Sequence, residues 1–489
     1  MADELRLALE THIKVLDQKS SEIDVLVIGS GTAGITTAIA LAEKKLGLKI
    51  AILEAGPLTL LSHVASSPLK LNERAVSLLQ NQITYKTTWS EKEQSLAPNT
   101  TGWAAVGGRT LIWRGNIPRF RPEDFQDWPL TYEEFDPYYS RAEKLLSVGV
   151  FVNSEGQKVL MKELKKSGFD FRASSVAIDS SCSENGNLPV GFDSSIARLL
   201  RSDYLVTFGE SPGISLTSEV EVVSLEKKGE RIEAVHVVDQ RTETPYTLAP
   251  KYIVIAAGGI QSVRLVMASK IEENEDVLGC YINDHLLAHA FFRRHSGVWK
   301  DRFHLYSPPT AHNPFHFQLC GPLTKEKMEF HKSNLATLPT RWVGWNEPGD
   351  YLECEIFGRS TSDQNKRLIL MDDGIGLSSC KVIHPKSQED LSVLHSMKNG
   401  TKKLAAAMDA ELLGWTILPV GIPMHDSGGL RMGTDPETSI VKPSGQFWRI
   451  PNLSVADASA WPSQGSANPY LTITAWALKQ ADELERIIT

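Results

Sequence analysis

The sequence is poor in cysteine. Its five cysteines are odd in number and far apart, and none belongs to a Cys-x-x-Cys pair. This pattern excludes a disulfide framework as the basis of the fold and predicts reduced thiols. The N-terminal stretch also lacks an apolar run followed by a small-residue cleavage site, so no secretory signal is expected. Together these absences predict a cytoplasmic protein.

Basic blocks and long apolar runs are absent as well. The net charge is −8, so neither nucleic acid nor an acidic membrane surface is expected as a partner. The longest apolar stretch, "VLVIGSGTAGITTAIALA", contains three glycines and four hydroxyl residues, which favours a turn in a soluble domain over a membrane span. With 489 residues the chain is too long for one simple core, so two domains or one composite domain are expected.

A nucleotide-binding motif is present near the N-terminus. Residues 24–28, "DVLVI", have the pattern of a buried strand, and "GSGTAG" follows with glycines at 29, 31 and 34. A helical stretch and a second strand, "KIAILE", then lead to Glu54, which lies 20 residues beyond Gly34. Strand, glycine turn, helix, strand and acid are the elements of a dinucleotide site. The fingerprint itself does not separate NAD from FAD, although "EAGP" is compatible with FAD.

Each glycine of this fingerprint has an expected role. Gly29 makes the tight turn, Gly31 lets the backbone approach a pyrophosphate, and Gly34 lets the helix pack closely on the strand. The helix N-terminus stabilises the phosphate charge.

The middle of the chain predicts further elements. The glycine pair in "WAAVGGRTLIWRGNIPRF" (103–120) fits either close approach to a ligand or a simple turn. Thr131 and Glu134 form a capping box that opens a helix, which we expect Pro137 to interrupt before it resumes. The stretch "KYIVIAAGGIQSVRLVMAS" predicts another parallel strand, a glycine turn and a helix.

Residues 285–375 have a different pattern of apolar and polar residues. Apolar and polar positions alternate in "FHFQLCG", "YLECEIFGR" and "RLILMDD", as in an antiparallel sheet, and a helix over about 388–413 closes this layer. His285 and His289 are four residues apart and share a face in a strand. No third ligand accompanies them and their flanks are rich in phenylalanine, so core positions are favoured over a metal site.

The stretch "HDSGGLRMG" (425–433) is too rich in glycine for a stable helix and too polar for a buried strand. His425 is either a structural histidine or a functional one. Further on, "PYLTITAWALKQADELERII" predicts a helix with Pro469 in its first turn and Asn468 at or beside the N-cap.

Five motifs occur in one order: the N-terminal fingerprint, the glycine-pair loop, "AAGGIQSVRLVMAS", "HDSGGLRMG" and "NPYLT". Together they resemble the glucose–methanol–choline (GMC) oxidoreductase family of flavoenzymes, over nearly the whole chain and most strongly at both ends. The loop "VGGRTLIWRGNIPRF" is most similar to the pyranose-oxidising branch. Residues 285–420 match the family only in their general pattern of apolar and polar residues.

The resemblance implies an α/β fold, with a Rossmann-type FAD-binding domain on a parallel sheet and an α+β substrate domain on an antiparallel sheet. The FAD-binding domain would comprise residues 1–130, 211–284 and 421–489. The substrate domain would comprise residues 131–210, which are helical, and residues 285–420.

The resemblance also implies the site residues. His425 matches the family's active-site histidine and Asn468 its partner, so both are expected to be catalytic. Asp457 and Ala458 would lie on the pyrophosphate side, and Val220 would touch the adenine. The residues expected to bind FAD are Gly29, Gly31, Thr32, Ala33, Gly34, Glu54, Ala55, Gly107, Gly108, Thr110, Val220, Asp457, Ala458, Asn468, Pro469 and Thr472. No metal is expected.

One position departs from the pyranose-oxidising pattern. That branch commonly has a histidine that tethers the flavin covalently, and Ile112 stands in its place. We therefore expect dissociable FAD.

The implied reaction is oxidation of an alcohol in a polar, sugar-like or cyclitol-like small molecule. His425 would take the hydroxyl proton, because an imidazole suits a general base at neutral pH, and flavin N5 would take the hydride. Oxygen or another acceptor would reoxidise the flavin. A non-redox flavin-containing lyase and an NAD-dependent dehydrogenase stay open as alternatives, and the sequence does not indicate the oligomeric state.

Overall fold

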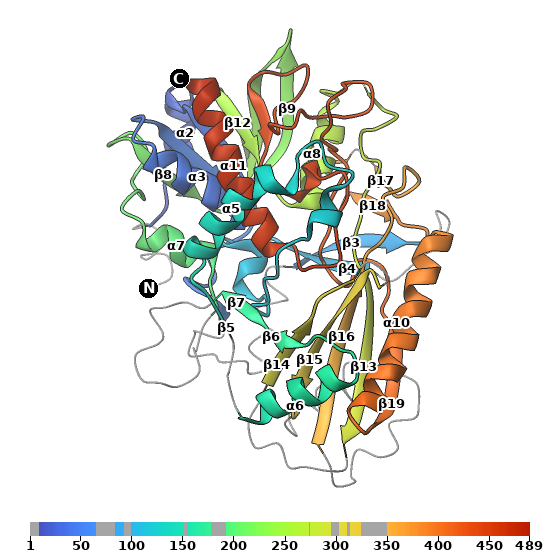
Figure 1. Cartoon of the computed structure of the whole chain (residues 1–489). Coiled ribbons are helices and arrows are strands. Elements are labelled where there is room, and N and C mark those ends of the chain that lie inside the picture. Colours follow the sequence, from blue (N-terminus) through green and yellow to red (C-terminus); the bar gives the residue numbers. More distant parts are fainter. Residues whose placement is uncertain are drawn as a thin grey trace.

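The computed structural model describes residues 9–64, 84–91, 99–150, 155–177, 192–272, 274–294, 303–310, 313–323, 350–372 and 374–489. A parallel sheet with its helices forms the upper part of the molecule in Figure 1, and an antiparallel sheet forms the lower part. The two layers meet at the functional site.

The parallel sheet is built from short, fully buried strands. Its order is β20 (Leu453–Val455), β12 (Tyr252–Ile255), β1 (Val25–Ile28), β2 (Lys49–Leu53) and β8 (Gly213–Thr217). Adjacent strands run parallel throughout. Continuous runs of β-branched residues are typical of strands covered on both faces. The predicted strands at "DVLVI", "KIAILE" and "KYIVIAA" are thus confirmed, as is the Rossmann-type fold class.

Helices from distant parts of the chain cover this sheet. The main pair is α3 (Thr32–Glu43) and α11 (Tyr470–Ile488), which pack side by side and join through the Thr32 and Thr474 hydroxyls, 3.1 Å apart. Four more helices lie in this part of the fold: α2 (Ile13–Gln18), α5 (Tyr132–Leu145), α7 (Ser195–Arg201) and α8 (Gly259–Ser269). The chain's C-terminal helix therefore lies against its first long helix.

Helix α5 begins at the predicted capping box of Thr131 and Glu134. The expected interruption at Pro137 is wrong, because the helix runs through it without a break. Phe135 and Tyr139 flank the proline and are buried, with the Tyr139 hydroxyl 2.9 Å from that of Thr472 on α11. Burying two aromatic side chains yields about 1.5–3 kcal/mol each, which offsets the roughly 3 kcal/mol that an internal proline costs.

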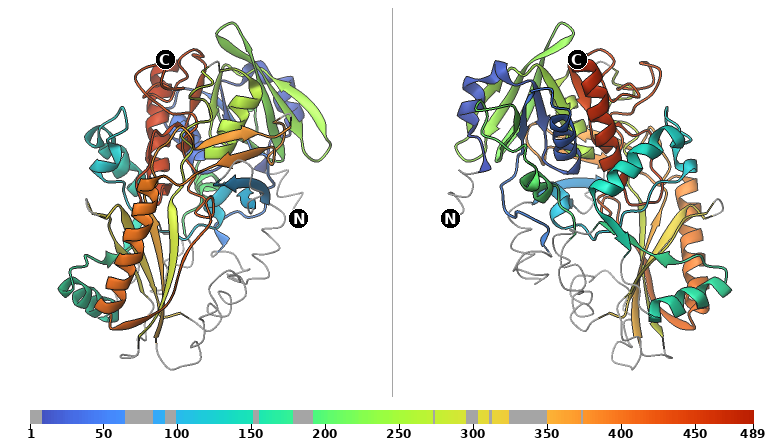
Figure 2. Two further views of the ribbon diagram at one scale, coloured as in Figure 1. Left: turned by 90° about the vertical axis from the view of Figure 1, so that its right-hand side faces the viewer. Right: turned by 60° about the vertical axis from the view of Figure 1, so that its left-hand side comes forward.

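The antiparallel sheet has the strand order β19 (Ala410–Ile417), β13 (Leu286–Arg294), β16 (Asp350–Gly358), β15 (Phe315–Gly321), β14 (Phe303–Ser307) and β6 (Arg172–Ala173). Helices α10 (Gln388–Ala407) and α6 (Glu155–Lys166) lie along it, as Figure 2 shows. The predicted helix over 388–413 ends early, because Asp409 takes a left-handed turn (φ 50°) and the following residues join the sheet as β19.

Two smaller sheets complete the main architecture. One contains β9 (Val220–Lys228), β10 (Arg231–Asp239) and β11 (Thr244–Leu248), and the other contains β17 (Arg367–Leu370), β18 (Cys380–Ile383), β3 (Thr84–Ser90) and β4 (Asn99–Trp103). Strands β5 (Val148–Val150) and β7 (Ser175–Ala177) pair with each other. The expectation that "RLILMDD" belongs to the substrate sheet is wrong, since β17 pairs with β18 instead.

Two separate groups of buried apolar side chains support this division into layers. One surrounds the parallel sheet, and the other fills the space between the antiparallel sheet and helices α6 and α10. Within residues 131–210, α5 and α7 contribute to the first group and α6 to the second. The domain boundaries predicted from the sequence stay a prediction. In the described part of the chain, no helix is both long and apolar enough to cross a membrane.

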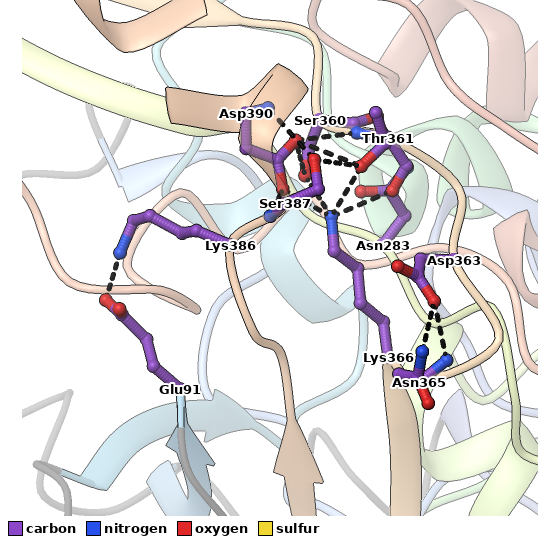
Figure 3. Close-up of polar contacts among 10 residues, drawn as sticks. All are labelled: Glu91, Asn283, Ser360, Thr361, Asp363, Asn365, Lys366, Lys386, Ser387 and Asp390. Atoms are coloured by element: carbon purple, nitrogen blue, oxygen red, sulfur yellow. Dashed lines mark hydrogen bonds and ion pairs between the residues drawn. The ribbon is translucent and has the colours of Figure 1, made fainter. Parts of the chain in front are cut away.

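A buried ion pair fixes the N-terminus of α10. Figure 3 shows Lys366 pointing into a ring of oxygens, with Nζ donating to Asp390 Oδ2 (2.8 Å), the Ser360 hydroxyl (2.7 Å) and the Thr361 carbonyl (2.8 Å). Both charged side chains are fully buried. The Ser360 backbone carbonyl also accepts from the Asn283 side-chain amide, so this cluster supports the segment that leads into β13.

We predict that Lys366→Met destabilises the protein strongly. The substitution leaves the Asp390 carboxylate buried without its cation, which costs about 3–5 kcal/mol. The midpoint of urea unfolding should fall accordingly. Lys402→Met, at an exposed position of the same helix, should change stability by no more than about 0.5 kcal/mol. Equal midpoints for the two variants would contradict the role given to the ion pair.

Candidate active site

A cavity of about 550 Å³ lies where the two layers meet. One wall is formed by residues at the carboxyl ends of the parallel strands, which is where open α/β sheets bind their ligands. The opposite wall is formed by strands β13, β15 and β16 of the antiparallel sheet. A ligand in this cavity would contact both layers.

The three fingerprint glycines occupy different environments. Gly29 has φ 105°, and a Cβ there would lie 2.4 Å from the Ala256 carbonyl oxygen. A Cβ on Gly34 would lie 1.9 Å from the Gly29 oxygen, so any side chain would push α3 off the strand. A Cβ on Gly31 meets nothing within 4 Å. Gly31 therefore borders open space at the N-terminus of α3, where a phosphate group would be stabilised.

Glu54 holds the glycine loop in place. Its Oε2 accepts from the Ser30 hydroxyl (2.6 Å) and the Ser30 backbone N–H (3.1 Å), and Oε1 accepts from the Gly56 N–H (3.0 Å). Burial raises the pKa of this carboxyl group, although the three hydrogen bonds oppose the shift. Glu54 also lines the cavity, as a residue that binds ribose hydroxyls must.

The glycine pair lies against the fingerprint. Gly107 and Gly108 both have left-handed backbones, with φ values of 95° and 54°, and the Gly107 N–H donates to the Ser30 hydroxyl at 3.1 Å. A Cβ on Gly108 would come within 3.3 Å of the Gly31 Cα. The Thr110 hydroxyl donates to the Gly107 carbonyl at 2.6 Å and thereby closes this turn.

Asp457 organises the C-terminal side of the cavity. Its Oδ1 accepts from the Ser459 N–H at 2.9 Å, and it caps the short helix η6 (Ala458–Ala460). Its Oδ2 accepts from the Gly258 N–H (2.8 Å) and the Ser262 hydroxyl (2.6 Å) at the start of α8. The carboxylate thus joins the turns that follow β12 and β20.

Most residues predicted to bind FAD line this one cavity. They are Gly29, Gly31, Thr32, Ala33, Glu54, Ala55, Gly108, Thr110, Val220, Asp457, Ala458, Asn468 and Pro469. Gly34, Gly107 and Thr472 do not line it: Gly34 packs α3 on β1, Gly107 shapes the loop, and Thr472 bonds to Tyr139 on α5. An N-terminal helix end, open space beside Gly31 and a carboxylate at the end of β2 are features that fit a dinucleotide.

His425 lies on the cavity wall on an irregular segment. Met424, directly before it, has a left-handed backbone (φ 55°), and the His425 N–H donates to Asp284 Oδ1 at 3.2 Å. Its ring stacks on Phe357, with centroids 5.4 Å apart. Burial holds the pKa of His425 well below its usual value near 6.5, and nearby Arg109 acts in the same direction. The ring is therefore neutral at pH 7.

Asn468 has its side chain orientation set by two donors. Its Oδ1 accepts from Gln318 Nε2 at 2.6 Å and from Asn116 Nδ2 at 3.2 Å. Gln318 Nε2 also donates to His316 at 2.8 Å, which agrees with this amide assignment. Among the described residues no hydrogen-bond partner is found for Asn468 Nδ2. Asn468 can therefore donate a hydrogen bond into the cavity.

The antiparallel sheet presents a polar row to the cavity. His289, Glu355 and Gln318 are direct neighbours on β13, β16 and β15, and all three line the wall. Arg114 forms an ion pair with Glu355 across the cavity. Burial alone would raise the pKa of Glu355, but Arg114 overcomes this effect and lowers it to about 2. This end of the cavity therefore offers a carboxylate, a guanidinium, an imidazole and an amide.

A second cluster of charged residues lies next to the backbone of His425. Arg109 donates to the Met424 carbonyl at 2.6 Å and pairs with Asp426, while Asp284 is buried nearby. Burial, together with the neighbouring Asp426 carboxylate, raises the pKa of Asp284 to about 8. These three residues fix the backbone on both sides of His425.

The sequence did not point to the antiparallel wall of the cavity or to this cluster of charged residues. The alternation in "FHFQLCG" and "YLECEIFGR" predicts a sheet, but it also separates a polar face from an apolar one and is the signal that identifies Gln318 and Glu355. The favoured core assignment of His285 and His289 is only half right. Both side chains are buried, but His289 also lines the cavity. No cluster of three or more metal-ligating side chains occurs among the described residues.

Comparisons with known proteins agree with this geometry. The family model described as GMC oxidoreductase matches the chain in two parts, an N-terminal model over residues 23–287 and a C-terminal model over residues 385–477. The matched segments contain the glycine fingerprint, the glycine pair, His425 and Asn468.

Individual relatives are distant but extend over the full length. A 2-methyl-1,2-propanediol dehydrogenase from Mycolicibacterium austroafricanum is 24% identical, over 96% of each chain. A C-glycoside 3-oxidase from Microbacterium trichothecenolyticum is 24% identical, over 96% of this chain and 98% of that one. A solved structure of a formate oxidase from Aspergillus oryzae RIB40, studied for its FAD modification, shares the fold with a TM-score of 0.71 at 15% identity, over 98% of this chain and 99% of that one. The chain belongs to the GMC oxidoreductase family, and it is an FAD-dependent oxidoreductase that acts on CH–OH donors.

Proposed function

We propose that this enzyme oxidises an alcohol group of a polar, sugar-like or cyclitol-like small molecule to a carbonyl. His425 acts as the general base, and Asn468 donates a hydrogen bond to the same substrate oxygen. The observation that carries this proposal is that both side chains line one cavity, with Asn468 held by Asn116 and Gln318 so that its amide N–H groups remain for a ligand.

The residues divide the work of the reaction. When bound, FAD supplies the acceptor for the hydride that leaves the carbinol carbon. A neutral His425 accepts the hydroxyl proton, and its lowered pKa keeps it ready to do so at neutral pH. The hydrogen bond from Asn468 stabilises negative charge that develops on the oxygen as the proton leaves. Phe357, stacked on His425, excludes water from one side of the ring.

The polar row supports the proposed substrate class. Glu355 can accept hydrogen bonds from vicinal hydroxyl groups, Arg114 and His289 add donors beside it, and Gln318 adds the acceptor Oε1, since both of its N–H groups are already bonded. A long aliphatic or sterol substrate would instead cover this polar row without offering hydrogen bonds, at a cost of about 1–3 kcal/mol for each donor or acceptor atom that has no protein partner. The relatives named as a C-glycoside oxidase and a propanediol dehydrogenase act on small hydroxylated molecules, in line with this proposal.

We also propose that FAD is bound without a covalent link. Ile112 lines the cavity. The sequence resemblance matches it to the position where the pyranose-oxidising branch commonly has its tethering histidine, and a hydrocarbon side chain cannot form such a bond. Acid precipitation of the yellow protein should therefore release the flavin into the supernatant. Flavin that stays with the washed pellet would contradict this proposal.

Gly31→Val is predicted to abolish FAD binding while leaving the fold intact. The added methyl groups enter the open space beside the N-terminus of α3, where the pyrophosphate would lie. The ratio of 450 nm to 280 nm absorbance and the circular dichroism of the purified protein measure the two properties. Gly34→Val is the contrasting variant, because its side chain would collide with the Gly29 backbone and should prevent folding. Wild-type flavin content in Gly31→Val would remove Gly31 from the site.

The reaction is tested by anaerobic mixing with alcohols. Sugars, aminosugars and cyclitols should bleach the flavin, whereas sterols and long-chain alcohols should not. Preference for the second group would refute the substrate class, and product formed without any bleaching would favour a lyase.

With a reducing substrate in hand, His425→Ala should slow flavin reduction roughly 10²- to 10⁴-fold, as expected for loss of a general base. Asn468→Asp keeps the shape and the acceptor atom but lacks the N–H donor, so it should slow reduction about 10- to 10²-fold. In the wild type the rate should rise with pH through the lowered pKa of His425, below about 6.5, and stay level above it. This limb should vanish in His425→Ala. A yellow His425→Ala protein with the wild-type rate would end the assignment.

A further inference from the structure

A second histidine lies directly behind His425. His285 ends the segment that leads into β13, is 3% exposed, and does not line the cavity. Its Nδ1 lies 2.8 Å from Nδ1 of His425, and its Nε2 lies 2.8 Å from the Gly465 carbonyl oxygen. The two rings are nearly perpendicular, at 87°. The three groups thus form a chain of two hydrogen bonds that ends at Nδ1 of His425.

The chemistry of these groups fixes where each proton lies. A carbonyl oxygen can only accept, so His285 Nε2 must carry a hydrogen and donate it to Gly465. Burial lowers the pKa of His285 to about 4, so at neutral pH its ring has one hydrogen and Nδ1 is an acceptor. The hydrogen between the two rings must then belong to His425 Nδ1. In a neutral His425 this leaves Nε2 with a lone pair.

We propose that His285 is a positioning residue that holds His425 in the tautomer whose unprotonated Nε2 takes the alcohol proton. The statement that His425 takes this proton rests on the proposed function, whereas the statement about its tautomer does not. In the transfer the substrate O–H bond breaks and an Nε2–H bond forms. His425 keeps its Nδ1–H throughout and continues to donate it to His285.

Three further contacts fix the position of the His425 backbone and the plane of its ring. Phe357 stacks on its face at 5.4 Å, and the same phenylalanine contacts His285 edge-on at 5.8 Å. The His425 backbone is tied to Asp284, the residue before His285. A flipped ring would place a C–H group against His285 Nδ1 and leave that buried acceptor without a donor, which is unfavourable.

Among the described residues no hydrogen-bond partner is found for His425 Nε2, and His425 is part of the cavity wall while His285 is not. The unprotonated nitrogen is therefore the one that a substrate can reach. A histidine held in the other tautomer would present an N–H there and could not accept a proton.

The tautomer is tested directly by NMR of the holoenzyme labelled with ¹⁵N-histidine. The pattern of long-range proton–nitrogen couplings distinguishes the two neutral tautomers, and the His425 signals are assigned by their absence in His425→Ala. We expect His425 protonated at Nδ1 and His285 protonated at Nε2. Protonation of His425 at Nε2 would overturn the proposal, whatever the enzyme's substrate proves to be. The expected tautomers in a protein that no alcohol reduces would instead refute only the proposed function.

A pair of variants tests the consequence for the reaction. His285→Leu removes the acceptor and should slow flavin reduction by about 10²-fold with little change in KM, as loss of an orienting partner does. His285→Asn can place an amide oxygen near the position of Nδ1, so it should restore the rate to within about 10-fold of wild type. His395→Leu, on the exposed side of α10, controls for histidine loss and should react normally.

Equal slowing of the Leu and Asn variants at full flavin content would overturn the proposal, as would a wild-type rate in His285→Leu. If His285→Leu fails to fold, the Asn variant and the tautomer measurement decide. In His285→Asn, a His425 ring still protonated at Nδ1 and a rate near that of the wild type would support the role of His285. A rate loss of about 10²-fold in that variant would contradict it.

Discussion

The site depends on one strip of backbone, residues 425–432. Ser427 exchanges two backbone hydrogen bonds with Asn283, at 2.8 and 2.9 Å. Farther along the strip, the N–H groups of residues 428, 430 and 432 donate to the carbonyls of Ala458, Ser459 and Ala460, respectively. This strip therefore connects the entry to β13 with the turn after β20, and so it joins the antiparallel sheet to the parallel sheet. Gly428 and Gly429 make the connection possible, because both have left-handed backbones and a Cβ on Gly428 would lie 2.1 Å from the Tyr281 oxygen. His425 is placed where it is because it begins this strip.

Local sequence was sufficient where a structure depends on local sterics. The glycine fingerprint, the capping box at Thr131 and the strand of "DVLVI" could be predicted, since each follows from backbone geometry or from a short run of residue types. The passage of α5 through Pro137 could not, because the compensating contact is made with α11, more than 300 residues away. The same holds for β17, whose partner strand is chosen by tertiary packing and not by its own alternating pattern.

The site was predictable in its parts and not in its arrangement. His425 and Asn468 stand in recognisable motifs, and both line the cavity. The residues that orient them do not stand in motifs: Gln318 and Asn116 direct the Asn468 amide, and His285 contacts His425. Their roles arise from donor and acceptor pairing across segments far apart in the sequence. A pattern read along the chain has no access to such pairing.

The alternation of side chains in the antiparallel sheet has a consequence for how this enzyme can diverge. Residues 287, 289, 318, 355 and 357 face the cavity, while their neighbours 286, 288, 290, 317, 319, 354 and 356 pack under α6 and α10. Selection can therefore change cavity-facing positions such as 287 and 289 one at a time without opening voids among the packed set, whereas Gln318 and Phe357 are constrained by their contacts with Asn468 and His425. Specificity and stability are encoded on opposite faces of the same strands. A lineage carrying this sheet can explore new alcohols at little risk of losing the fold that holds its flavin.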